Sequence, residues 1–351
     1  TTTDAHHYQE LLYALADLYC QGYELVDPGG EVDAVPPHVG LPTYPFAAEQ
    51  VWIEPAVSVG SGAHLHPLVH SNVSDVQGLR FVSTVSGREP FVRADGAGDV
   101  RVVRDGGVLE MARAAVVLSD RAGERAVQVH DVVWHEALLV GAAGQSVHVE
   151  LFDGAGADLN WQVCAADADS GDEELVHAAG AARLVERDAD VLDLGEVRQV
   201  CTEQVQLADT PRVHAVWASP DRSGSGWRVL IDLAVERGVL DPGVVIVEPR
   251  DLDAVVAAVA AAAPEPVHAG RMLALRSAEL AARGSRVCVA SVSVTEASAT
   301  RLVLDIDGCD ETGQVVWRLR GLEYGQARID ADDAAQVSVS EGDGGRVAGP
   351  G

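Results

Sequence analysis

The chain has 351 residues and a formal net charge of −29 at pH 7, and all 25 of its basic residues are arginine. An acidic surface of this kind repels phosphate backbones and anionic lipid headgroups, which makes nucleic acid and membranes poor partners. The five cysteines are scattered and match neither a zinc-site spacing nor a disulfide framework, which indicates a reduced, cytoplasmic setting. Hydrophobic residues make up 47% of the chain, enough for a sizeable core.

Residues 1–55 predict a helix followed by a linker. The pattern of residues 5–25 is that of an amphipathic helix. Its apolar side consists of Leu11, Leu12, Leu15, Leu18 and Tyr19. Residues 26–45 contain five prolines and several glycines, which favours an irregular strap. Because the chain begins Thr-Thr-Thr and ends in a glycine-rich stretch, we expect it to be a piece of a longer polypeptide.

Two predicted helices, residues 106–118 and 249–260, are rich in small residues and apolar on most sides, which is typical of buried helices. Strand-like runs surround both, and several alternate apolar and polar residues as in an antiparallel sheet. The expected strands are Leu79–Ser86, Val100–Val103, Ala126–Val133, Ser146–Phe152, Leu159–Ala165, Leu175–Leu184, Val213–Ala218, Trp227–Val235, Val244–Val247, Met272–Arg276, Arg286–Val294, Arg301–Asp307 and Val315–Leu322. This order predicts an α+β fold with two copies of a sheet wrapped round a helix. Residues 329–351 predict a disordered linker.

Seven short segments are specific as a set. They are Leu41–Phe46 (LPTYPF), Val51–Ile53, His66–Asp75, Arg80–Thr84, Leu109–Ala115, His177–Gly180 and Leu192–Leu194. Together they resemble the dehydratase domains of modular polyketide synthases, especially synthases served by separate acyltransferases, over about residues 35–325. The resemblance implies a double-hotdog fold: a post-ketosynthase linker at 1–55, a first hotdog at 56–185, a bridge at 186–210 and a second hotdog at 211–328.

The first half departs from this family where its catalytic histidine belongs. The family carries His-x-x-x-Gly-x-x-x-x-Pro just before the first helix. Counted back from Leu109 without gaps, the histidine position falls on Asp95 and the proline position on Arg104. A one-residue gap moves the histidine position to Gly96, so neither alignment supplies an imidazole.

The second half keeps one member of the catalytic pair. The family motif His-Pro-x-x-x-Asp-x-x-x-Gln places Asp253 at the catalytic aspartate, Glu248 at the histidine and Ala257 at the glutamine. Eliminating water from a 3-hydroxyacyl thioester needs a base for the α-proton and an acid for the leaving hydroxyl. An exposed Asp95 would ionise near ~4 and be a much weaker base than an imidazole. We therefore expect no ordinary dehydration, with Asp253 either a functional relic or a helix cap favoured by the dipole.

Other histidines offer no clear replacement. His64, His66 and His70 form a dense cluster, which the resemblance assigns to the opening segment of the fold. No matching set of metal ligands is visible elsewhere. His130 and His135 are five residues apart in a strand-like stretch and therefore face opposite sides.

Three functions follow from these observations. The resemblance favours a branching domain, which has lost the dehydratase pair and helps an upstream ketosynthase to add a malonyl-derived unit to the β-carbon of an unsaturated chain, forming a lactone, lactam or glutarimide. An acyl carrier protein would present the substrate on its phosphopantetheine arm, and no tightly bound cofactor or metal is implied. The alternatives are a degenerate dehydratase or double-bond isomerase, and a purely architectural module. A homodimer within the synthase is left open.

A docking face for a carrier protein would have to be locally basic, because carrier proteins are usually acidic. Arg318, Arg320 and Arg328 are candidates by clustering alone, as are Arg101 and Arg104. The competing interpretation is that these arginines are scattered over the surface.

Overall fold

The computed structural model divides the chain into two units, Thr1–Ser58 and Val59–Gly351. It describes residues 5–24, 64–76, 78–94, 101–119, 125–166, 174–186, 190–207, 210, 212–234, 240–268, 270–281 and 284–326. The predicted strap at 41–46, the Asp95 position and the predicted linker at 329–351 lie outside these residues.

The described part of the first unit is the helix α1 (Ala5–Cys20), which confirms the predicted amphipathic helix. Its apolar side chains are exposed, including Leu11, Leu15 and Leu18. None of the helices among the described residues combines the length and the apolarity needed to cross a lipid bilayer.

The described residues of the second unit form a 13-stranded antiparallel sheet. In spatial order its strands are β1 (Ser71–Asn72), β2 (Leu79–Val85), β7 (Gln145–Asp153), β8 (Leu159–Ala166), β9 (Glu174–Val185), β5 (Ala126–Trp134), β13 (Arg271–Leu280), β16 (Val315–Gly325), β15 (Arg301–Cys309), β14 (Val289–Ala297), β12 (Trp227–Leu233), β11 (Val213–Ala218) and β10 (Glu203–Gln204). A separate three-stranded sheet consists of β3 (Val92–Ala94), β4 (Arg101–Val103) and β6 (Leu139–Val140).

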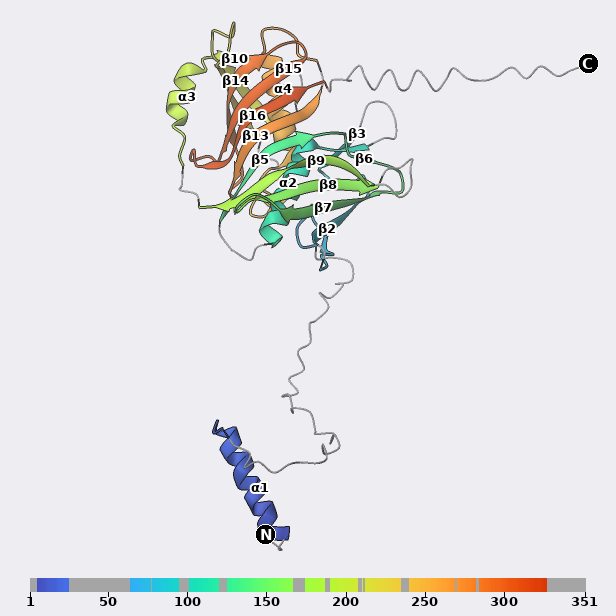
Figure 1. Ribbon diagram of the computed structural model, residues 1–351. Helices are drawn as coiled ribbons and strands as arrows, with labels where there is room; N and C mark the ends of the chain where they lie inside the picture. Colours follow the sequence, from blue (N-terminus) through green and yellow to red (C-terminus); the bar gives the residue numbers. More distant parts are fainter. Residues whose placement is uncertain are drawn as a thin grey trace, which may run out of the picture. The chain divides into compact units, whose positions relative to one another are not determined.

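The sheet has two halves, each with its own central helix, as Figure 1 shows. The helix α2 (Asp105–Ser119) contacts β5, β7, β8 and β9 in the first half, and α4 (Pro249–Ala262) contacts β11 and β12 in the second. The halves join where β5 pairs with β13, with Val132 opposite Leu275. Apolar side chains of both helices and both halves form one continuous core. This arrangement is the double hotdog that the sequence predicts.

Two parts of the second half differ from the sequence-based expectation. The apolar run Val244–Val247, predicted as a strand, is a turn, because side chains of α2 bind its backbone. The predicted bridge at 186–210 contains a short helix, α3 (Leu194–Val200), whose N-cap Asp193 accepts hydrogen bonds from the backbone N–H of Gly195 and Glu196. Seven residues are too few for helical periodicity to stand out in the sequence.

Each half of the sheet places a glycine directly opposite a buried tryptophan. Trp161 on β8 pairs with Gly180 on β9, and Trp317 on β16 pairs with Gly308 on β15. Both tryptophans are 1% exposed. A Cβ added to Gly180 would lie 2.9 Å from Cζ2 of Trp161, and one added to Gly308 would lie 2.7 Å from Cδ2 of Trp317. The rings therefore lie flat over positions that have no side chain.

We expect the substitution Gly308→Ala to lower the free energy of unfolding by about 1–3 kcal/mol, because the added methyl overpacks the core. Urea denaturation of the whole chain measures this. Gly141→Ala is the control, since a Cβ there meets nothing within 4 Å. If both variants unfold at the wild-type urea concentration, the tryptophan can move aside and the packing argument is wrong.

Candidate active site

The two central helices approach each other at their N-terminal turns. A Cβ added to Gly106 of α2 would lie 3.3 Å from Cα of Pro249 and 3.2 Å from Cδ2 of Leu252 in α4. A glycine at this point of α2 lets the backbones come close. The residues beside this contact, Arg104 and Asp105 from the first half and Asp253 from the second, are thereby brought together.

Asp253 forms an ion pair with Arg104, in which Nη1 of Arg104 donates to Oδ2 of Asp253. The side chain of Asp253 remains 31% exposed and that of Arg104 19% exposed. Burial raises the pKa of Asp253, and the positive charge of Arg104 opposes this rise. Asp253 does not cap its helix, because Glu248 is the N-cap of α4 and accepts from the backbone N–H of Arg250. Its carboxyl instead binds Arg104 of the first half.

Asp105, the first residue of α2, is a second carboxyl in this site that sequence reasoning missed. Its Oδ2 accepts a hydrogen bond of 2.9 Å from the backbone N–H of Met272, which lies near the start of β13. Burial raises the pKa of Asp105 to about 6, and the nearby charge of Asp253 adds to the rise. An aspartate at a helix start is common for reasons of capping and dipole alone, so the sequence carried no signal for this role.

A buried ionic cluster holds the turn that precedes α4. Glu110 of α2 is 0% exposed and pairs with Arg113, whose Nη2 lies 2.6 Å from its Oε1. The carboxylate also accepts from the backbone N–H of Ile246 at 3.2 Å and of Val247 at 3.0 Å. Arg113 in turn donates to the carbonyl oxygen of Val244 at 2.8 Å. Burial favours a raised pKa for Glu110, but Arg113 outweighs it and the pKa lies below its usual value.

Comparison with known proteins identifies a protein family and solved structures that are similar to this chain. Residues 66–166 match the polyketide synthase dehydratase domain family. Polyketide synthase PksN of Bacillus subtilis (strain 168) is 30% identical over 187 residues, which is 48% of this chain and 3% of PksN. Polyketide synthase ThaG of Burkholderia thailandensis is 32% identical over 232 residues, which is 62% of this chain and 4% of ThaG. The crystal structure of a trans-AT PKS dehydratase domain from Brevibacillus brevis has a TM-score of 0.67 and 24% identity, covering 76% of this chain and 100% of that one.

The chain contains a polyketide synthase dehydratase-like domain. It spans 3% to 4% of the length of the two synthases compared above.

The histidines of the opening segment do not contact Asp253 in the described part of the dehydratase-like domain. His66 is 5% exposed, and its Nε2 lies 3.3 Å both from Oε1 of Glu110 and from the carbonyl oxygen of Val244. Its Nδ1 accepts from the backbone N–H of Leu68, which leaves the ring proton on Nε2. The Asp95 position, one residue beyond the end of β3, lies outside the described residues. Among those residues, the one hydrogen-bonding partner of the Asp253 side chain is Arg104.

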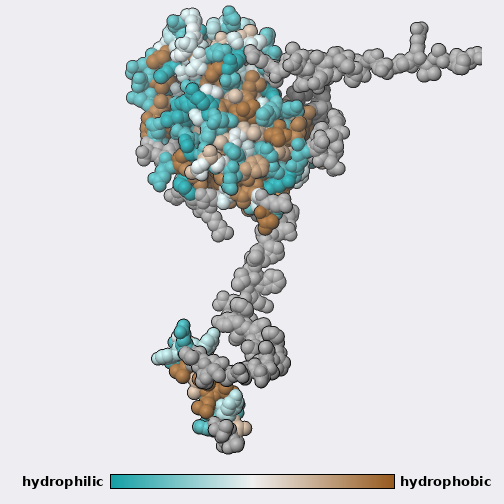
Figure 2. Space-filling view, viewed as in Figure 1, coloured by the Kyte–Doolittle hydropathy of each residue, from teal (hydrophilic) through white to brown (hydrophobic). Residues whose placement is uncertain are grey.

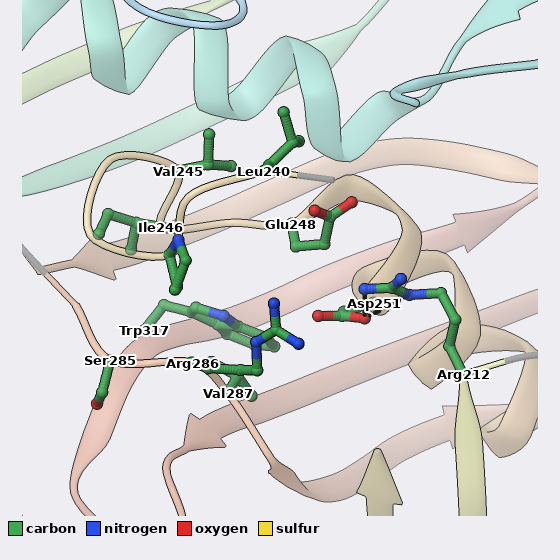
Figure 3. Close-up of a pocket in the computed structure, with 11 residues that line it drawn as sticks. Arg212, Leu240, Val245, Ile246, Glu248, Asp251, Ser285, Arg286, Val287 and Trp317 are labelled. Atoms are coloured by element: carbon green, nitrogen blue, oxygen red, sulfur yellow. Dashed lines mark hydrogen bonds and ion pairs between the residues drawn. The ribbon is translucent and has the colours of Figure 1, made fainter. Parts of the chain in front are cut away.

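A small polar cavity lies in the second half of the domain, at the start of α4 (Figure 3). It measures about 30 Å³ and is lined in part by Arg212, Asp251, Arg286 and Trp317. Nε of Arg212 donates to Asp251 at 2.6 Å, and burial raises the pKa of Asp251 to about 6. The space suits about one water molecule rather than an acyl chain. Among the described residues, no group of three or more His, Cys, Asp or Glu side chains could hold a metal ion.

The arginines proposed as a carrier-protein docking face are mostly paired. Arg318 and Arg320 both donate to Asp307, each at 2.7 Å, and Arg318 also pairs with Asp190. Arg328 lies outside the described residues. On the face of the second unit seen in Figure 2, hydrophilic and hydrophobic residues are interspersed. The pairing leaves this part of the sheet without a clear cationic surplus.

Proposed function

We propose that this dehydratase-like domain does not eliminate water, but positions a carrier-bound thioester so that an upstream ketosynthase can add a malonyl-type unit to the β-carbon of an unsaturated chain. The observation that carries the proposal is the ion pair between Arg104 and Asp253. In the family reaction the matching aspartate gives a proton to the leaving hydroxyl. Here a guanidinium is bound to the Oδ2 atom of that carboxyl.

The missing base supports the same proposal. Dehydration requires both members of an acid–base pair on opposite sides of the reacting carbons. The alignment leaves Asp95 or Gly96 at the histidine position. Of the histidines in the opening segment, His66 lies against Val244, and the rings of His64 and His70 stack on each other. Carbon–carbon bond formation by the ketosynthase does not need that pair from this domain. The domain would contribute by holding the donor thioester close to the acceptor, which lowers the entropic part of the barrier.

The intact framework also supports a binding role. Both halves keep a packed core, and their two helices still meet beside the aspartate position. We infer that an acyl carrier protein is the partner that delivers the thioester on its phosphopantetheine arm. We also infer that the lactone, lactam or glutarimide ring is closed on the ketosynthase after the branch has formed.

Reconstitution tests this function. The ketosynthase loaded with an unsaturated thioester is mixed with malonyl carrier protein, with and without the 351-residue chain, and the branched adduct is followed by mass spectrometry. We expect the chain to raise the rate of adduct formation about tenfold or more, as positioning effects commonly do. Equal rates without the chain would refute the proposal, and so would loss of water from a 3-hydroxyacyl carrier protein offered to the chain alone.

Asp105 favours one second candidate, double-bond isomerisation. Burial raises the pKa of Asp105 to about 6. A carboxyl with such a pKa can both accept and donate a proton near neutral pH. Moving a 2-enoyl double bond to the 3-position needs one proton taken from the γ-carbon and one returned to the α-carbon, and a single carboxyl can do both. In deuterated water, isomerisation should introduce deuterium into a 2-enoyl carrier protein without changing the number of its double bonds. Branching, in contrast, adds carbon atoms to the chain, so mass spectrometry distinguishes the two reactions.

A further inference from the structure

Among the described residues, the site around Asp253 contains more positive than negative side chains. Arg104 pairs with Asp253, and the charge of Arg93 lowers the pKa of both Asp253 and Asp105. Arg271, at the start of β13, also lowers the pKa of Asp105. Among the described residues, three guanidinium groups thus lie near two carboxyls, in a protein whose net charge is −29. When both carboxyls are ionised, one further negative charge would balance these five described side chains.

Several donors of these arginines are unused. Nη2 of Arg271 donates to the backbone carbonyl oxygens of Trp134 and His135, whereas its Nη1 is buried and has no hydrogen-bonding partner among the described residues. Nε of Arg104 is likewise buried, with no partner in the part of the chain that the structure describes. Arg93 is half-buried and has neither a hydrogen bond nor an ion pair with any other described residue through its side chain. A buried donor without an acceptor is unfavourable, and an oxygen-bearing anion would remove that cost.

The position of the site in the fold indicates which anion would bind there. The site lies at the aspartate position of the family, where the acyl end of a thioester reacts, and the exposed fractions of Asp253 and Arg104 show that solvent reaches it. The planar fork of a guanidinium matches the two oxygens of a carboxylate. The phosphate of a phosphopantetheine arm sits at the opposite end of that arm from the thioester. An acyl group that itself ends in a carboxylate provides the two oxygens and places them at the acyl end of the thioester.

We propose that Arg93, Arg104 and Arg271 form a binding site for the free carboxylate of a dicarboxylic acyl thioester of the malonyl type. This inference rests on the proposed function, since it identifies the donor thioester that the domain would hold. Arg93 and Arg271 supply the unpaired donors, and Arg104 shares its guanidinium between Asp253 and the ligand. Bound in this way, the thioester end of the donor projects away from the arginines.

Calorimetric titration of the 351-residue chain with small thioesters tests the site without the ketosynthase. We expect malonyl-pantetheine to bind at least about tenfold more tightly than acetyl-pantetheine, because only the former has a carboxylate for charge-assisted hydrogen bonds. Arg93→Gln and, separately, Arg271→Gln should reduce this preference to about twofold or less. Arg101→Gln is the matched control, because Arg101 is exposed on the neighbouring strand β4. Arg101 pairs with Ala94, the residue after Arg93, and successive residues of a strand point to opposite faces. The side chains of Arg93 and Arg101 therefore lie on opposite faces of this sheet.

Equal binding of the two thioesters, or binding of neither at millimolar concentration, would overturn the carboxylate site. Phosphopantetheine that competes as strongly as malonyl-pantetheine would show that the arginines bind phosphate, and would overturn it as well. A preference lost equally in Arg101→Gln would mean that overall charge, not this site, selects the ligand. The outcome is separate from that of the reconstitution: a retained malonyl preference with no effect on adduct formation would refute the branching function alone.

Discussion

Replacing Glu110 by alanine is expected to lower the free energy of unfolding by about 3–5 kcal/mol, the usual cost of removing one partner from a buried ion pair. The substitution leaves Arg113, which is 3% exposed, without its carboxylate. It also removes the acceptor for the backbone N–H groups of Ile246 and Val247. Equilibrium denaturation in urea measures the loss.

An exposed pair provides the control. Glu203 pairs with Arg222 at 2.9 Å, and their side chains are 48% and 27% exposed. Glu203→Ala should cost less than about 1 kcal/mol, because exposed ion pairs contribute little. The double substitution Glu110→Leu with Arg113→Met should recover part of the stability lost in Glu110→Ala, since no buried charge remains unpaired. Similar losses in Glu110→Ala and Glu203→Ala would show that the buried cluster does not hold the two halves together.

The same cluster explains why the sequence predicts some elements and misses others. The helices α2 and α4 follow from local patterns, because a small-residue helix that is apolar on most sides has to be buried. The run Val244–Val247 has the composition of a strand, but its amide groups bind a carboxylate 136 and 137 residues earlier in the chain. Local periodicity carries no information about such a partner, so the turn could not be predicted.

Likewise, only part of the candidate site can be predicted from the sequence. Asp253 is identified by its spacing from Pro249, a pattern contained within one helix. The sequence marks Arg104 as a departure from the proline of the family motif and as a docking candidate, whereas its pairing with Asp253 joins residues 149 apart. The role of Asp105 depends on burial against Met272 of β13 and on the charge of Asp253, which only the folded chain brings near. Sequence reasoning therefore found one carboxyl of the site and not its surroundings.

The pH dependence of stability should reveal the buried carboxyl at Asp105. Its pKa is raised from 3.8 to about 6 in the folded chain, so the unfolded chain loses this proton at lower pH than the folded one. The stabilisation is complete below the unfolded pKa and is lost as the pH rises through the folded pKa. A shift from 3.8 to about 6 corresponds to about 3 kcal/mol. Between pH 4 and 7, wild type should therefore lose about 2–2.5 kcal/mol of this relative to Asp105→Asn, whose side chain does not ionise, because part of the loss occurs below pH 4.

Comparing wild type with Asp105→Asn at each pH separates the contribution of Asp105 to stability from the contributions of other titratable groups. The raised pKa of Asp251 acts in the same direction, whereas the pKa values of His70 and His177, lowered by burial, favour the folded state as the pH rises. These contributions are common to wild type and variant and cancel in the difference. Asp221→Asn is the control, because the hydrogen bonds from Ser223 hold the pKa of Asp221 below its usual value and outside this pH window. Parallel stability profiles for wild type and Asp105→Asn would mean that Asp105 ionises as it does in water, and the case for it as a proton carrier would fall with that result.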